Sequence, residues 1–231
     1  MKFSREASMK NIKIAPSMLC ADFIHLGRDL DIFAERGIEY LHIDIMDGHY
    51  VPNFTLGPDY CRALSAYSSI PLDVHLMIEP VDFFIPRFAA FPDTLITFHP
   101  EAVYHPLRSL QLIRDQGARA GIAIDPATPL GTVRHLLPYI EVLCIMTVNP
   151  GYSGQALIPG MIDKIREASA YCRESGYDIL IEADGNVSWE NIPLMLEAGA
   201  DILVAGTSSL YDKKMTLEEN ITRLRTMCGH A

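Results

Sequence analysis

Short apolar runs alternate with longer amphipathic segments along almost the whole chain. The apolar runs have the length and the Val, Ile and Leu content of buried strands, and the segments between them have the period of helices. The predicted strands cover residues 12–18, 39–45, 71–77, 94–98, 119–124, 141–148, 178–183 and 201–205. The predicted helices cover 22–36, 57–67, 80–90, 105–116, 129–138, 159–175, 188–198 and 208–228. In the last of these, Thr216 and Glu219 have the spacing of a capping box, so this helix is expected to begin there after a loop.

This alternation predicts the fold class. Strands that alternate with helices imply a parallel sheet. Eight strand–helix units fit an α/β protein with a closed (β/α)8 TIM barrel, which typically needs about 250 residues. An open doubly wound sheet would favour a Gly-rich turn after the first strand, where this chain has PSMLCADF instead. We predict one barrel domain over 9–231, preceded by a polar extension over 1–8 for which disorder and an upstream start are both open interpretations.

Composition and charge narrow the class of partner. Hydrophobic residues make up 49% of the chain and charged residues 21%, an ordinary globular balance. The formal net charge of −10 is expected to repel nucleic acid and anionic membranes, so neither is predicted as a partner. No apolar run is long enough to span a bilayer, and the first residues lack the apolar segment of a secretory signal. The five cysteines form no C-x-x-C pair, which favours reduced thiols in a cytoplasmic protein.

Polar residues at the ends of several strands are the candidate chemistry, because barrel active sites lie at the C-terminal ends of the strands. In LHIDIMDG, His42 and Asp44 are two positions apart, so their side chains share one face of a strand. His75 in PLDVHLM and Asp184 in ILIEADG end two further strands. Two imidazoles and two carboxylates around one mouth are suitable ligands for Zn, Mn, Fe or Co.

Each of these residues taken alone is more often structural, as a core histidine or a helix-capping aspartate. The set of four favours a site, because burying unpaired carboxylates is costly without a cation. Asp44 and Asp184 could also exchange a proton on opposite faces of a carbon beside a carbonyl, which results in epimerisation. His99 and Asp73 are interpreted as structural or as supports behind the ligands.

Three methionines, Met46, Met77 and Met146, also fall at strand ends. Methionines in such positions are more often core filler. The alternative is a dry apolar wall beside a planar enediolate, which would keep the dielectric low around developing charge.

Glycine-containing loops follow the last three strands: PGYSG at 150–154, DGN at 184–186 and GTSS at 206–209. Short loops of this kind before helices present backbone N–H groups to an anion, and two of these positions are recurrent phosphate sites in barrels. No lysine is placed to help, so the hydroxyls of Ser153, Thr207 and Ser208 would supplement the backbone.

The motifs APSMLCADF, LHIDIMDGHYVPNFTLGP, PLDVHLMIEP, IDPATPL, IMTVNPGYSGQALIP and IEADGN resemble, in this order, the ribulose-phosphate 3-epimerase family. The resemblance runs from about Ile14 to Tyr211 and implies the ribulose-phosphate-binding type of barrel. It implies one divalent metal ion, held by His42, Asp44, His75 and Asp184. Asp44 would be the proton acceptor and Asp184 the donor.

The same resemblance implies that Ser17 contacts the substrate. His75 and the strand-end methionines Met46, Met77 and Met146 are expected to lie against it as well. The phosphate would be held by Gly151, Tyr152, Ser153, Gly154, Gly185, Asn186, Gly206, Thr207 and Ser208. Loop 48–55 is a candidate lid, and the family implies assembly into a homo-oligomer.

The substrate is expected to be a phosphorylated ketose. The loops GYSG, DGN and GTS depart from the pentulose pattern, and TFHPE at 97–101 and GTSSLY at 206–211 are closer to the D-allulose-6-phosphate 3-epimerase branch. We therefore expect conversion of D-allulose 6-phosphate to D-fructose 6-phosphate, with D-ribulose 5-phosphate to D-xylulose 5-phosphate as the alternative. A barrel lyase or decarboxylase would want a lysine at a strand end, where none is predicted. A non-catalytic phosphosugar binder would not need the complete acid–base pair.

Overall fold

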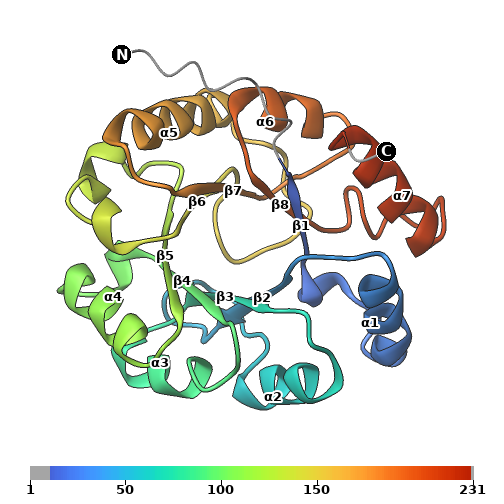
Figure 1. Cartoon of the computed structure of the whole chain (residues 1–231), viewed down its shortest axis with the longest axis horizontal. Coiled ribbons are helices and arrows are strands. Elements are labelled where there is room, and N and C mark those ends of the chain that lie inside the picture. The colour runs from blue at the N-terminus through green and yellow to red at the C-terminus, as the bar shows by residue number, and fades with distance from the viewer. Residues whose placement is uncertain (1–10, 230–231) are drawn as a thin grey trace.

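The computed structural model describes residues 11–229, which form a barrel of parallel strands ringed by helices (Figure 1). Strand pairing runs continuously from β1 through β8 and back down to β2. A parallel bridge between Ser17 and His42 joins the two ends and completes the circle. The strands are β1 (Lys13–Pro16), β2 (Leu41–Met46), β3 (Leu72–Met77), β4 (Leu95–Phe98), β5 (Arg119–Ile124), β6 (Val142–Met146), β7 (Leu180–Asp184) and β8 (Ile202–Ala205). The predicted barrel is confirmed, while the extension predicted over 1–8 lies outside the described residues.

Helices follow most strands and cover the outside of the barrel (Figure 1). The α-helices are α1 (Leu26–Glu35), α2 (Pro58–Tyr67), α3 (Val81–Phe88), α4 (Pro106–Asp115), α5 (Met161–Ser175), α6 (Ile192–Ala198) and α7 (Leu217–Met227). Two short 3₁₀ turns, η1 (Met18–Cys20) and η2 (Pro100–Ala102), follow β1 and β4. Across the described part of the chain, no helix combines the length and apolar character needed to cross a membrane.

One predicted helix is replaced by shorter turns, and the last helix begins where its capping residues predict. The segment 129–138 forms two 3₁₀ turns, η3 (Leu130–Val133) and η4 (Leu137–Tyr139), in place of an α-helix. Gly131 and Pro138 leave too few good helix formers between them, and Pro138 disfavours the helical conformation of the residue before it. The last helix begins at Leu217, and residues 208–216 form turns and loop before it.

The predicted capping box sets the start of α7. The amide of Glu219 donates to the Thr216 hydroxyl at 3.2 Å, and the amide of Thr216 donates to the Glu219 carboxylate at 2.8 Å. These two bonds satisfy amides that would otherwise have no partner at the helix start.

Side chains inside the barrel form layers of different chemistry. An apolar cluster of Ala15, Tyr40, Leu95, Val142 and Ile202 fills the N-terminal end. Above it the strand register pairs His42 with Asp73 and Cys144 with Glu182. The next layer pairs Asp44 with His75 and Met146 with Asp184. The residues between these on the strands face outward and pack in the main core beneath the helices. The buried imidazoles and carboxylates therefore lie above this apolar cluster.

Candidate active site

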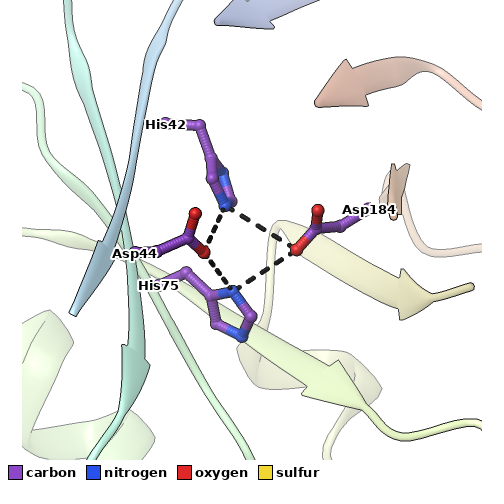
Figure 2. A group of neighbouring side chains, drawn as sticks. All are labelled: His42, Asp44, His75 and Asp184. Carbon is purple, nitrogen blue, oxygen red and sulfur yellow. Dashed lines mark ion pairs between the residues drawn. The ribbon is translucent and has the colours of Figure 1, made fainter. Parts of the chain in front are cut away.

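Four side chains predicted as metal ligands meet inside the barrel mouth (Figure 2). Oδ1 of Asp44 lies 3.3 Å from Nε2 of His42 and 3.4 Å from Nδ1 of His75. Oδ2 of Asp184 lies 3.8 Å and 3.5 Å from the same two nitrogens. The two carboxylates approach from opposite sides, and the imidazoles lie between them. The structure brings these four predicted residues together at one place, and their role as metal ligands stays a prediction.

The donor set fits a divalent cation. The two histidines are completely buried, and their inward nitrogens, Nε2 of His42 and Nδ1 of His75, make no hydrogen bond among the described residues. Buried polar atoms are rarely left without a partner, so two such atoms facing two carboxylates indicate an absent positive group. Nitrogen and carboxylate ligands in this number are suitable for Zn, Mn, Fe or Co.

Each carboxylate keeps one oxygen outside the centre. The Ser17 hydroxyl donates to Oδ2 of Asp44 at 3.2 Å. The Asp44 and Asp184 side chains are 12% and 14% exposed, so both reach the pocket above. This arrangement lets each aspartate contact a cation through one oxygen and exchange a proton through the other.

The buried charges shift the pKa values of the group. Burial opposes ionisation of Asp44, but the contacts with His42 and His75 outweigh it and hold the pKa of Asp44 well below its usual range. Burial also lowers the pKa of His75, yet Asp184 and Asp44 outweigh this effect and raise the pKa of His75 to about 9. Without a cation, protons on the imidazoles therefore balance the carboxylates.

A second set of buried carboxylates lies beneath His42. Nδ1 of His42 lies 2.6 Å from Oδ2 of Asp73 and 3.2 Å from Oε1 of Glu182. Burial and the neighbouring charge of Asp73 raise the pKa of Glu182 to about 8. The interpretation of Asp73 as a support agrees with this contact, which leaves Nε2 of His42 directed at the centre. Glu182 could not be singled out from the sequence beyond its place at a strand end.

The pocket above the centre brings together the other predicted site residues. Ser17, the three strand-end methionines and all nine predicted phosphate-loop residues line it. The methionines are 1–4% exposed, and Met46 and Met77 pack with Val51 of loop 48–55. His42 and His75 lie beneath the pocket rather than in its lining. Among its lining residues in the described chain there is no lysine or arginine.

The loop after β7 has a backbone that only certain residues adopt. Gly185 has φ +110°, and a Cβ there would lie 2.6 Å from Val148 and 3.0 Å from the Thr147 hydroxyl. The next residue, Asn186, has φ +43°, a left-handed conformation that asparagine tolerates better than most residues. This path lets the backbone of the loop run close to the pocket.

The side chain of Asn186 is directed at the protein. Its Nδ2 donates to the carbonyl of Gln155, and its Oδ1 accepts from Nδ2 of Asn191 at 2.8 Å. Gln155 in turn donates to the carbonyls of Asn149 and Tyr152, at 2.6 and 2.9 Å. The residue therefore ties the loops after β6 and β7 together. Gln155 lines the pocket and was not identified from the sequence, because its part depends on loop geometry.

Loop 48–55 lies against the loop after β6. Nδ2 of Asn53 donates to the carbonyl of Gly151 at 2.8 Å, and the Tyr152 hydroxyl donates to the carbonyl of Pro52 at 2.9 Å. The loop is thus held at the edge of the pocket by two side-chain contacts. Its action as a lid stays a prediction.

Comparison with solved structures defines the class of fold. A mutant tryptophan synthase α-subunit from Pyrococcus furiosus superimposes with a TM-score of 0.68, over 96% of this chain and 99% of that one. At 16% sequence identity, this similarity concerns the barrel alone.

Sequence comparison defines the family. The family model described as "Ribulose-phosphate 3 epimerase family" matches residues 13–210. The ribulose-phosphate 3-epimerase of Escherichia coli (strain K12) is 47% identical over 89% of this chain and 91% of its own length. That of Bacillus subtilis (strain 168) is 44% identical over 90% of this chain and 97% of its own. The chain belongs to the ribulose-phosphate 3-epimerase family and is an isomerase of the epimerase type.

Proposed function

We propose that the chain interconverts D-ribulose 5-phosphate and D-xylulose 5-phosphate by epimerisation at C3. Support comes from the relatives in E. coli and B. subtilis, which carry the name ribulose-phosphate 3-epimerase and align over nearly their whole length. This substrate is the alternative from the sequence, and the expected D-allulose 6-phosphate receives no such support.

The direction of the Asn186 side chain removes an argument for the longer hexulose phosphate. The loop DGN departs from the pentulose pattern, and its asparagine, Asn186, brings an amide donor to the loop. That amide is engaged at both ends, with the Gln155 carbonyl and with Asn191. Its oxygen and one of its N–H groups are therefore bonded within the protein, and the change of loop sequence is compatible with a pentulose phosphate.

The proposed chemistry assigns one role to each aspartate. Asp44 removes the C3 proton from one face of D-ribulose 5-phosphate, and Asp184 delivers a proton to the opposite face, with the roles exchanged in the reverse direction. A divalent ion held by these aspartates with His42 and His75 would stabilise negative charge on the substrate oxygens as a Lewis acid. The Ser17 hydroxyl, bonded to Oδ2 of Asp44, keeps that oxygen oriented toward the pocket.

The surrounding residues hold the substrate and exclude water. Met46, Met77 and Met146 form an apolar wall beside the reacting carbons, which strengthens electrostatic interactions there. The glycine-containing loops after β6, β7 and β8 offer backbone N–H groups and hydroxyls to the phosphate. Because no basic side chain lines the described pocket, the loops would supply this binding themselves.

The test is kcat/KM for D-ribulose 5-phosphate and D-allulose 6-phosphate, measured side by side on protein of defined metal content. We expect a clear preference for the pentulose phosphate. The Asn186→Gly variant is the matched control, and it should leave the ratio of the two values unchanged, since the amide faces the protein. A preference for the hexulose phosphate would refute the substrate assignment, and activity on neither would refute the function.

The compartment and the assembly stay proposals. The five cysteines are free thiols, which is typical of a reducing compartment and supports the predicted cytoplasmic location. A homo-oligomer is proposed from the family alone.

A further inference from the structure

A series of four side chains runs from the metal-ligand cluster to loop 48–55. Nε2 of His75, the ring nitrogen turned away from the cluster, lies 2.8 Å from Nε2 of His99. On the other side of that ring, Nδ1 of His99 lies 3.1 Å from Oδ1 of Asp125. The Tyr50 hydroxyl donates to Oδ2 of Asp125 at 3.0 Å. The two histidines are completely buried, so bulk water does not compete for these contacts.

One arrangement of protons satisfies the whole series when His75 binds a cation through Nδ1. That nitrogen must offer its lone pair, so the ring proton lies on Nε2 and donates to Nε2 of His99. His99 then accepts at Nε2 and carries its own proton on Nδ1, where Asp125 faces it. Neither Nδ1 of His99 nor Oδ1 of Asp125 has another hydrogen-bond partner among the described residues. The carboxylate thus fixes the tautomer of His99, and His99 fixes that of His75.

We propose that His99 and Asp125 are positioning residues, which hold the His75 ring with its proton on Nε2 and thereby set the affinity of the site for a divalent ion. The inference rests on the proposed function, because it takes His75 as a metal ligand. His42 is held differently, since its Nδ1 contacts the Asp73 carboxylate directly at 2.6 Å. Partners behind ligating histidines orient the ring and increase its basicity as a ligand.

The carboxylate end of the series is anchored in turn. The ammonium of Lys164 on α5 donates to the carbonyls of Asp125, Pro126 and Thr128, at 2.6, 3.2 and 2.7 Å. These bonds hold the turn after β5 that presents Asp125. The rings of Tyr50 and His99 also pack in a tilted arrangement, with 4.9 Å between centroids. The position of loop 48–55 and the orientation of His75 therefore depend on the same carboxylate.

The first test is the Zn²⁺ dissociation constant at one fixed pH, measured by competition with a chromophoric chelator. His99→Leu removes the acceptor for His75 and should weaken binding by about 10- to 100-fold. Asp125→Asn removes the charge but keeps an acceptor oxygen, so a smaller loss in the same direction is expected. His99→Gln offers its own carbonyl oxygen to Nε2–H of His75 and should recover most of the affinity.

Ser109→Ala is the matched control. The Ser109 hydroxyl is buried and bonded to Asp82 between α4 and α3, outside the barrel. Its removal should lower stability without changing the Zn²⁺ dissociation constant. A loss of affinity in Ser109→Ala equal to that in His99→Leu would overturn the proposal, because the effect would then be general destabilisation.

A second measurement reads the tautomers directly and remains available if His99→Leu does not fold. In Zn²⁺-loaded protein with ¹⁵N-labelled histidine, Nε2 of His75 and Nδ1 of His99 should both appear as protonated nitrogens. Two results would overturn the positioning role: the opposite tautomer of His75, or unchanged Zn²⁺ affinity in both Asp125→Asn and His99→Leu. Either result would leave the epimerase function unaffected. A wild-type protein that binds no divalent ion would instead overturn the metal centre itself, and the positioning role with it.

Discussion

Replacing Asp184 with asparagine separates the two halves of the proposed reaction. Asparagine keeps an oxygen where Oδ2 now lies, 3.5 Å from Nδ1 of His75 and 3.8 Å from Nε2 of His42. The shape of the centre is therefore retained, while one of its two negative charges and one of its two proton carriers are lost. Asp44 and its bond from Ser17 are unchanged.

The magnitude follows from the loss of the proton carrier. A positioned acid or base contributes about 10²- to 10⁴-fold to the rate, which corresponds to about 3 to 5 kcal/mol. Epimerisation should fall by at least this factor, because no other acidic side chain lines the pocket on that side in the described residues. The loss of one ligand charge weakens metal affinity as well, so rates are compared at saturating metal with the bound ion quantified.

The assay follows hydrogen exchange at C3 in deuterated solvent, starting separately from each epimer. In Asp184→Asn, Asp44 can still remove and return the proton of D-ribulose 5-phosphate, so deuterium should enter that sugar without inversion. D-xylulose 5-phosphate presents its proton to the missing group and should not exchange. Asp44→Asn is the matched variant, and the pattern should reverse.

Two results would refute the two-aspartate mechanism. One is epimerisation by Asp184→Asn within tenfold of the wild-type rate at equal metal content. The other is equal exchange into both epimers in either variant, which would mean that a single group reaches both faces of C3.

Three further changes test other parts of the molecule. Gly185→Ala should destabilise the fold by about 1–3 kcal/mol, because its Cβ would lie 2.6 Å from Val148, and should raise KM more than it lowers kcat. Thermal melting and steady-state kinetics measure these effects, and an unchanged KM would contradict the prediction. Zn²⁺ affinity should rise with pH up to about 9, because the pKa of His75 in the metal-free protein is raised to about 9 and the ligand must be deprotonated. Calorimetry in buffers of different ionisation enthalpy should show proton release on Zn²⁺ binding at neutral pH, and a lack of proton release would refute the link between binding and deprotonation. Thr216→Ala should cost about 1 kcal/mol in urea unfolding with kcat unchanged, and an equal loss of activity would show that α7 affects the site.

The ligand cluster could be predicted because it depends on regular geometry. Side chains two apart on a strand share a face, so His42 and Asp44 had to point the same way. Barrel closure then brings β2 and β3 beside each other and places β7 across the mouth, which adds His75 and Asp184. Both rules act at the level of the backbone, and neither depends on side-chain rotamers.

Other parts of the site depend on rotamers and loop paths, which periodicity does not encode. The contact of His99 with Asp125 joins the ends of β4 and β5 through one ring orientation. Asn186 could have faced the pocket or the protein, and its direction is set by Gln155 and Asn191 in two different segments. The segment 129–138 has an apolar helical period, yet its glycine and proline override that period.

The buried charges of the barrel interior explain how one site can be compatible with both a metal-free and a metal-bound state. Burial and the neighbouring charge of Asp73 raise the pKa of Glu182 to about 8, which favours its neutral form. Despite burial, the facing carboxylates raise the pKa values of His42 and His75, so both imidazoles hold protons in the metal-free interior. A divalent ion bound by two neutral imidazoles would take the place of about two protons, so metal binding would leave the net charge of the core nearly unchanged. The barrel should therefore fold without metal, unlike small domains whose unbalanced ligands prevent folding until the ion binds.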